Sequence, residues 1–108
     1  MKKAILLFFL VVLTAQLSAQ EKSLVTVKNT AVNNGVLLVN IQEAGKPLEL
    51  QCTQSAPHCT APAPASYWMV RLPPNHGMYD CANVELYSQS ENPENSDKVL
   101  GEYCLNEK

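Results

Sequence analysis

The sequence predicts an all-β protein, built as a small sandwich or barrel of about six strands stapled by disulfides. Two observations carry this prediction. Segments of strand-like composition recur along the chain with turn signals about every 8 to 15 residues, which is typical of all-β domains. The chain of 108 residues also contains four cysteines, and a core of this size benefits from such staples.

The first three strands are predicted by composition and alternation. Residues 24–28 (LVTVK) are rich in β-branched side chains, and residues 36–42 (VLLVNIQ) form an apolar run of the kind found in a buried strand. Residues 29–35 (NTAVNNG) end in an Asn-Asn-Gly turn signal and predict the connection between them. Residues 48–52 (LELQC) alternate with period two, as a half-buried strand does.

Residues 53–66 predict a long loop. The segment contains Pro57, Pro62 and Pro64 and has no apolar periodicity. Prolines at this spacing exclude a helix and remove the donors that a sheet ladder needs.

Residues 66–72 (SYWMVRL) predict a strand with two different faces. One face carries apolar side chains and is expected to be core, with Trp68 as its large anchor: Trp68, Val70 and Leu72. The other face has the mixed composition that is enriched at protein interfaces. That face is a candidate binding surface, which the proline-containing loop could instead cover: Tyr67, Met69 and Arg71.

The last two strands are predicted at residues 79–88 and 98–105, joined by the polar stretch SENPENSD. In the first of these, Ala82, Val84 and Leu86 share a face. A helix capped by Asp80 is the alternative, but the alternation favours a strand.

An even number of cysteines in an exported chain predicts disulfides, and four cysteines allow three pairings. We expect Cys52–Cys59 because the two residues lie close together around a turn-like segment. We expect Cys81–Cys104 because a hairpin centred on Asn92-Pro93 would place these two residues opposite each other, within disulfide reach.

Residues 1–19 predict export. Lys2 and Lys3 precede an apolar run from Ala4 to Leu13 and a small-residue exit at Ala19, which together resemble a secretory signal peptide. The run is too short for a membrane-spanning helix. Cleavage would leave residues 20–108 as one small β domain in the periplasm or the medium, with no membrane span.

The charge of residues 20–108 excludes some partners. Without Lys2 and Lys3, six basic residues remain against ten acidic ones, a net charge of about −4. An acidic chain without a basic cluster argues against binding to nucleic acid or to anionic membranes.

The sequence contains no catalytic constellation and no cofactor motif, so we predict neither an enzyme nor a cofactor. The one suggestive metal-ligand spacing is His76 with Cys81, which we keep as the alternative to a disulfide at Cys81. His58 is expected to be an ordinary solvated loop residue.

Three segments resemble those of small, uncharacterised exported proteins of soil bacteria: YWMVRLP (67–73), GMYDCANVELY (77–87) and LGEYC (100–104). The resemblance covers about residues 45–107, includes the cysteines and implies no activity. The periplasmic lysozyme-inhibitor barrels are also small, exported, β-rich and disulfide-bonded. Their Ser-Gly-x-x-Tyr stretch is missing here, so they remain an analogy.

We therefore expect a non-catalytic binding or accessory module whose stapled loops present a preorganised surface to a protein or a small molecule. A structural protein of the cell envelope and a small metal-binding protein are the alternatives. The ligand and the oligomeric state stay open.

Overall fold

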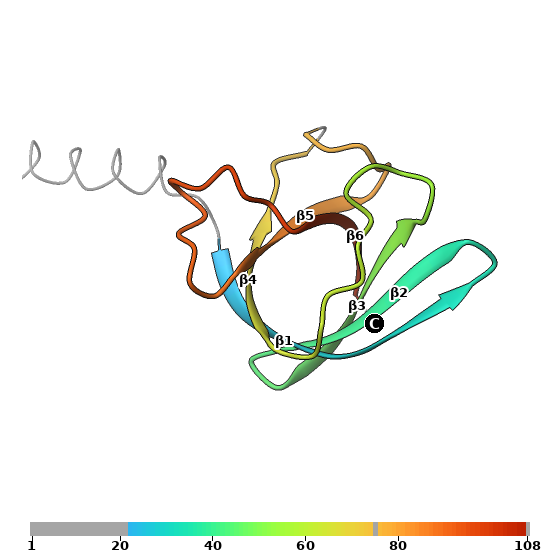
Figure 1. The fold of residues 1–108 in the computed structure, drawn as a ribbon, viewed down its shortest axis with the longest axis horizontal. Helices are drawn as coiled ribbons and strands as arrows, with labels where there is room; N and C mark the ends of the chain where they lie inside the picture. The colour runs from blue at the N-terminus through green and yellow to red at the C-terminus, as the bar shows by residue number, and fades with distance from the viewer. Residues whose placement is uncertain (1–21, 75, 108) are drawn as a thin grey trace, which may run out of the picture.

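The computed structural model describes residues 22–74 and 76–107, and the predicted signal peptide (residues 1–19) lies outside the described residues. All six strands pair antiparallel and close into a barrel in the order β1-β2-β3-β6-β5-β4, with β4 pairing back onto β1 (Figure 1). The strands are β1 (Lys22–Asn33), β2 (Val36–Glu43), β3 (Lys46–Thr53), β4 (Ser66–Arg71), β5 (Ala82–Ser88) and β6 (Gly101–Glu107). The predicted all-β, disulfide-stapled fold is confirmed, and of the two predicted architectures the chain adopts the barrel. The described residues include no helix long and apolar enough to cross a membrane.

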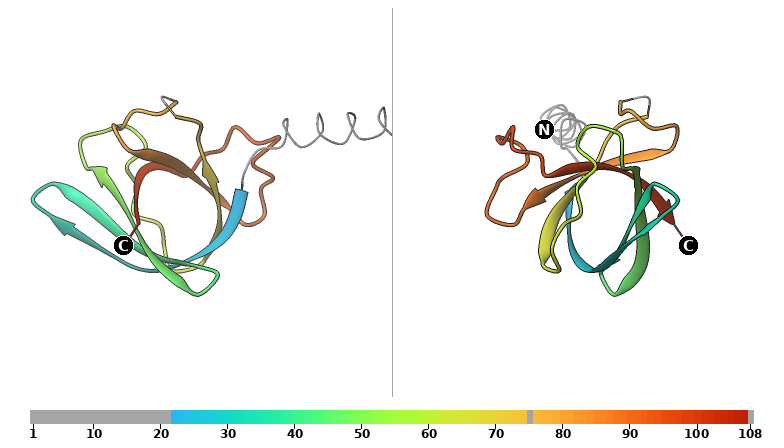
Figure 2. Two further views of the ribbon diagram at one scale, coloured as in Figure 1. Left: turned by 180° about the vertical axis from the view of Figure 1, so that it is seen from behind. Right: turned by 45° about the vertical axis from the view of Figure 1, so that its right-hand side comes forward.

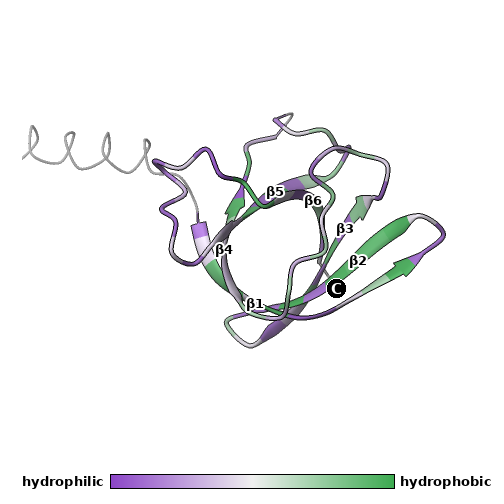
Figure 3. Ribbon diagram, viewed as in Figure 1, coloured by the Kyte–Doolittle hydropathy of each residue, from purple (hydrophilic) through white to green (hydrophobic). Residues whose placement is uncertain are grey.

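The barrel interior is filled by side chains. Alternate residues of each strand are buried, whereas β2, which begins with four apolar residues in a row, is hydrophobic over most of its length (Figure 3). An eight-stranded barrel is just wide enough for its side chains, so a six-stranded one has room for little else. The most completely buried side chains are Val25, Val27, Val39, Ile41, Leu50, Met69, Val84, Leu86 and Tyr103.

β1 and β2 form a hairpin longer than the sequence predicts. Residues 29–33 were expected to lie in a connection, but they continue β1 and pair with residues 36–40 of β2. The turn itself is only Asn34-Gly35, with φ angles of 53° and 79°, and these positive values suit the two-residue type I′ turn that matches strand twist. The polar residues 29–33 are therefore held in a strand by their backbone pairing with the apolar strand β2.

The loop between β3 and β4, residues 54–65 (hereafter the proline loop), crosses one end of the barrel (Figure 1). It must cross, because β3 and β4 lie on opposite sides of the ring of six strands. The Tyr67 hydroxyl donates to the Ala63 carbonyl over 2.5 Å, and the Tyr103 hydroxyl donates to the Thr60 carbonyl over 2.6 Å. Burial raises the pKa of Tyr103, which keeps its hydroxyl protonated as a donor. Two tyrosines of the barrel wall therefore hold the proline loop in place.

The expectation that Tyr67, Met69 and Arg71 form a binding surface is wrong, and the proline loop contacts this face, which is the alternative that the sequence leaves open. Tyr67 and Met69 are 9% and 0% exposed and point into the barrel, so they cannot form the predicted binding surface with Arg71. Trp68 lies on the outer face and is only partly buried. Both faces of this strand carry large apolar groups, and the alternation alone could not tell which one faces inward.

Trp68 attaches a second loop to the outside of the barrel. Its indole Nε1–H donates to the carbonyl of Gln89 over 3.2 Å. The Lys22 ammonium lies 5.2 Å from the centroid of the indole ring and 3.8 Å from a carboxylate oxygen of Glu94. These contacts hold residues 89–100 (the polar loop) against β4 and the start of β1 (Figure 2).

Both predicted disulfides are present, Cys52–Cys59 and Cys81–Cys104, but the reason given for the second is wrong in register. Cys104 lies opposite Asn83, and β5 begins at Ala82, so Cys81 is two residues away from the predicted pairing. Cys81 reaches Cys104 because the chain leaves the ladder before β5, which brings the two Cα atoms to 5.8 Å. Structural disulfides of this kind are consistent with an oxidising compartment.

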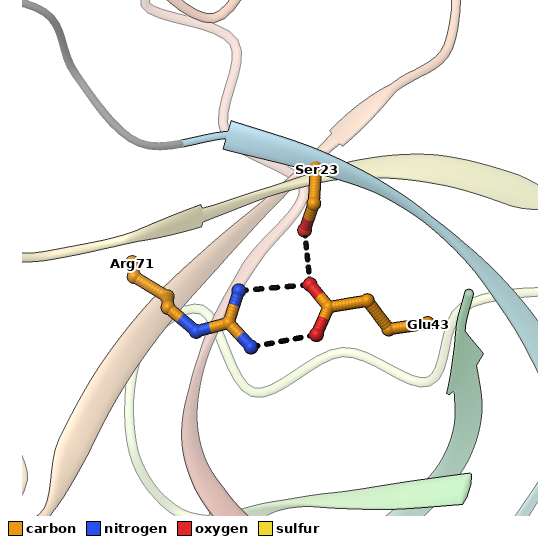
Figure 4. Close-up of polar contacts among 3 residues, drawn as sticks. All are labelled: Ser23, Glu43 and Arg71. Carbon is orange, nitrogen blue, oxygen red and sulfur yellow. Dashed lines mark hydrogen bonds and ion pairs between the residues drawn. The ribbon is translucent and has the colours of Figure 1, made fainter. Parts of the chain in front are cut away.

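A partly buried ion pair lies at the other end of the barrel. Arg71 at the end of β4 donates from its two terminal nitrogens to both carboxylate oxygens of Glu43 over 2.7 and 2.8 Å (Figure 4). The Ser23 hydroxyl donates to the same carboxylate. The hydrogen bonds from Arg71 are the main cause that lowers the pKa of Glu43 to about 2.

We expect Glu43→Gln to lower the free energy of unfolding at neutral pH by about 1–3 kcal/mol, because Arg71 would lose its bidentate bonds to a carboxylate at a partly buried position. The folded-state pKa of Glu43 lies below its ordinary value of 4.5, so its stabilisation is complete above that value and is lost as the pH falls towards 2. Urea denaturation at several pH values should show the variant and the wild type converging over this window.

The matched control for this prediction is Glu91→Gln, which removes a carboxylate whose partner, Lys98, is 78% exposed. The control should change stability by less than about 0.5 kcal/mol. A difference between wild type and Glu43→Gln that stayed constant down to about pH 2 would contradict the role assigned to the ion pair.

Candidate functional site

Buried side chains fill the interior of the barrel, so the candidate site lies on the outer surface. A cleft of about 220 Å³ opens between the base of the β2–β3 hairpin and the segment that precedes β5. We refer to it as the cleft. Its lining residues are Val36, Gln51, Cys52, Thr53, Tyr79, Asp80, Cys81 and Cys104.

One wall of the cleft belongs to the sheet. Val36, the first residue of β2, lies opposite Thr53 at the end of β3. On the other side of β3, Gln51 lies opposite Cys104 of β6. The disulfide from Cys52, which is buried, continues into the proline loop. This wall is therefore made of paired strands and a covalent link.

The opposite wall is residues 79–81, which a single side chain shapes. The Asn83 amide donates to the carbonyls of Tyr79 and Cys81 over 2.7 and 2.9 Å and accepts from the Tyr79 N–H over 3.0 Å. Asn83 itself is only 6% exposed, and a Cβ added at Gly77 would come within 2.5 Å of its side chain. The sequence predicted a strand at residues 79–81. Their backbone groups instead form hydrogen bonds with the side-chain amide of Asn83.

The Cys81–Cys104 disulfide joins the two walls. Cys81 belongs to the segment before β5 and Cys104 to the outer face of β6, and both line the cleft. The wall of residues 79–81 is thus held at Cys81 by the disulfide and at Tyr79 by hydrogen bonds to Asn83. The cleft is therefore preorganised, which lowers the entropic cost of binding.

The chemistry of the cleft is mainly apolar with one charge. Tyr79 and Val36 supply apolar surface, and the Tyr79 hydroxyl is buried without a hydrogen-bond partner among the described residues. Asp80 is exposed at the rim and makes no ion pair with any described residue. An apolar floor beside a single carboxylate suits an apolar molecule that carries a cationic or donor group.

The structure does not support the metal alternative at His76 and Cys81. The Cys81 sulfur is bonded to Cys104 and cannot act as a thiolate ligand. Within residues 22–74 and 76–107, no group of three or more histidine, cysteine or acidic side chains is placed to hold a metal ion. His58 is exposed, as predicted, and contributes its backbone carbonyl, which accepts from the Glu102 N–H over 3.0 Å.

A second hollow lies within the polar loop and is a weaker candidate. It measures about 260 Å³ and is lined by Glu91, Asn92, Asn95, Ser96, Asp97 and Lys98. All of these residues belong to the polar loop. Polar side chains of this loop form hydrogen bonds with its own backbone; for example, the Asn92 side chain accepts from the Glu94 N–H. The cleft is better built because three strands and a disulfide define it.

Sequence reasoning identified the cysteines of the cleft but missed the residues around them. Gln51, Thr53 and Asp80 carry no motif. Gln51 and Thr53 lie on β3, and Asp80 comes close to them because β6 pairs between β3 and β5. The one usable signal was Tyr79, an aromatic residue two positions before a disulfide cysteine.

The chain matches no protein-family model, no curated protein and no solved structure at a significant level. Its fold and its cleft are therefore interpreted from its own residues.

Proposed function

We propose that this protein is an exported, non-catalytic binding module that holds a small amphipathic ligand in the cleft. The ligand class is an apolar body, aromatic or aliphatic, with a cationic or hydrogen-bond-donating end. The observation that carries the proposal is the pairing of an apolar cleft, walled by Tyr79 and the Cys81–Cys104 disulfide, with the exposed carboxylate of Asp80. The signal peptide predicted at residues 1–19 and the disulfides, which are typical of oxidising compartments, support the proposal of export.

Preorganisation supports binding in preference to catalysis. The walls are held by a disulfide and by three hydrogen bonds to Asn83, and the cleft presents a carboxylate without a neighbouring base or nucleophile among its lining residues. Such a site can select a ligand by shape and charge.

The proposal is tested by amide chemical shifts with two probes of opposite charge, phenethylamine and 3-phenylpropionate. We expect phenethylamine to shift the amide signals of Gln51, Thr53, Tyr79 and Asp80, and 3-phenylpropionate to bind at least tenfold more weakly. Asp80→Asn should remove this preference for the cation, because the variant keeps the size of the side chain and loses the charge. The matched control, Asp97→Asn, lies in the polar loop and should leave both titrations unchanged.

Shifts confined to the polar loop, or equal binding of the two probes, would contradict the proposal. A complete lack of response from both probes at millimolar concentration would also reject the cleft as a site for this ligand class.

A further inference from the structure

The outer part of β1 has an unpaired edge. β1 pairs with β4 only through residues 22–26, whereas its pairing with β2 continues to Asn33. The N–H of Val27 donates to the Ala65 carbonyl over 2.8 Å, and beyond it no described residue bonds the backbone of residues 28–33 on that side. The β1–β2 hairpin projects away from the barrel, and no other described strand runs along this edge (Figures 1 and 2).

The turn determines which backbone groups this edge presents. In a two-residue hairpin the residues that flank the turn, Asn33 and Val36, form a hydrogen-bonded pair, and such pairs alternate along the ladder. Ala31 therefore points its N–H and C=O towards β2. Thr30 and Val32 point theirs outward, where a further strand could pair with them.

We propose that the edge formed by residues 28–33 pairs antiparallel with the same edge of a second copy of this chain. Ala31 lies on the two-fold axis opposite Ala31 of the second copy. Thr30 then lies opposite Val32 of the second copy, and both residues present outward-facing backbone groups. On the order of four main-chain hydrogen bonds would cross the interface.

Self-complementarity favours a second copy over another strand. The two outward-facing residues are placed symmetrically about Ala31, whose small side chain lets the backbones approach at the axis. In this register Lys28 faces Asn34 of the second copy, so no like charges lie opposite each other. The pairing also covers part of Val32, an apolar residue that is 54% exposed.

The interface is small, so the dimer should be weak, with a dissociation constant on the order of 0.1 mM. This inference is independent of the ligand proposed for the cleft, because the cleft lies on the β3 side of β2 and the edge lies on the other side.

A charge swap at the axis tests the proposal. Sedimentation equilibrium of the disulfide-bonded protein should show a monomer–dimer equilibrium up to about 1 mM. Ala31→Lys and Ala31→Glu should each weaken the dimer at least tenfold, because each places like charges directly opposite one another. An equimolar mixture of the two variants should associate at least tenfold more tightly than either variant alone.

Gln89→Lys, on the polar loop, is the matched control for the added charge and should dimerise like the wild type. A wild-type protein that stays monomeric at about 1 mM overturns the proposal. A dimer that Ala31→Lys does not weaken, or a mixture that fails to associate, overturns it as well, because either result places the contact elsewhere.

Discussion

The double substitution Cys81→Ser with Cys104→Ser is expected to lower the free energy of unfolding by about 3.5 kcal/mol. The bond closes a loop of 23 residues, and the chain-entropy relation gives that value for a loop of this size. The loss is large for a domain of this size, whose core alone supplies only a few kcal/mol. Removing the bond would also remove the covalent link between the two walls of the cleft.

Urea denaturation measured by tryptophan fluorescence gives the stability change, since the single Trp68 lies on the folded barrel wall. The comparison variant is Cys52→Ala with Cys59→Ala, whose shorter loop contributes about 2.5 kcal/mol through chain entropy. Cys52 is 2% exposed, so this variant also loses core contacts. A loss below about 1 kcal/mol for the Cys81–Cys104 pair would show that the bond does not constrain the fold as we infer.

Gly101→Ala is expected to cost about 3 kcal/mol, close to the effect of losing a disulfide. A Cβ at this position would lie 2.3 Å from the hydroxyl oxygen and 2.6 Å from the Cζ atom of Tyr103. Tyr103 is fully buried and its hydroxyl is bonded to the Thr60 carbonyl, so the ring cannot move without displacing the proline loop.

A double-mutant cycle with Tyr103→Leu isolates this contact. Leucine lacks the ring atoms that the new Cβ would meet, so Gly101→Ala should cost less than about 1.5 kcal/mol in that background. If the two substitutions were additive, the cost at Gly101 would have to come from the backbone, and the close approach to Tyr103 would not be its cause.

The sequence predicts the β class and both disulfides because these follow from local signals: period-two alternation, turn residues and an even cysteine count. It fails where a choice depends on distant partners. On β4, Tyr67 and Trp68 are both large and apolar enough to be core. The inward choice depends on the Glu43 carboxylate, which accepts from Arg71 at the end of the barrel, and on the proline loop, whose Ala63 carbonyl accepts from Tyr67.

Residues 79–81 show a second limit of the sequence. Their alternation with β5 predicts a strand, but the buried Asn83 side chain bonds their backbone and holds it in a loop. The pairing of Cys81 was right although its register was wrong, because a disulfide tolerates a range of backbone geometries that a ladder does not. The cleft could not be predicted from the sequence either. Its walls come from several strands, and no local sequence pattern determines the order of those strands around the barrel.

We propose an exported barrel whose cleft is held by formed disulfides. The most direct test is the intact mass of the protein from its native compartment, with and without thiol alkylation in the absence of reductant. We expect the mass of residues 20–108, within a residue or two of the predicted cleavage position, with no alkyl group added to any cysteine. Two or more alkylated thiols, a retained segment 1–19, or a mass that falls when a chelator is added would contradict it.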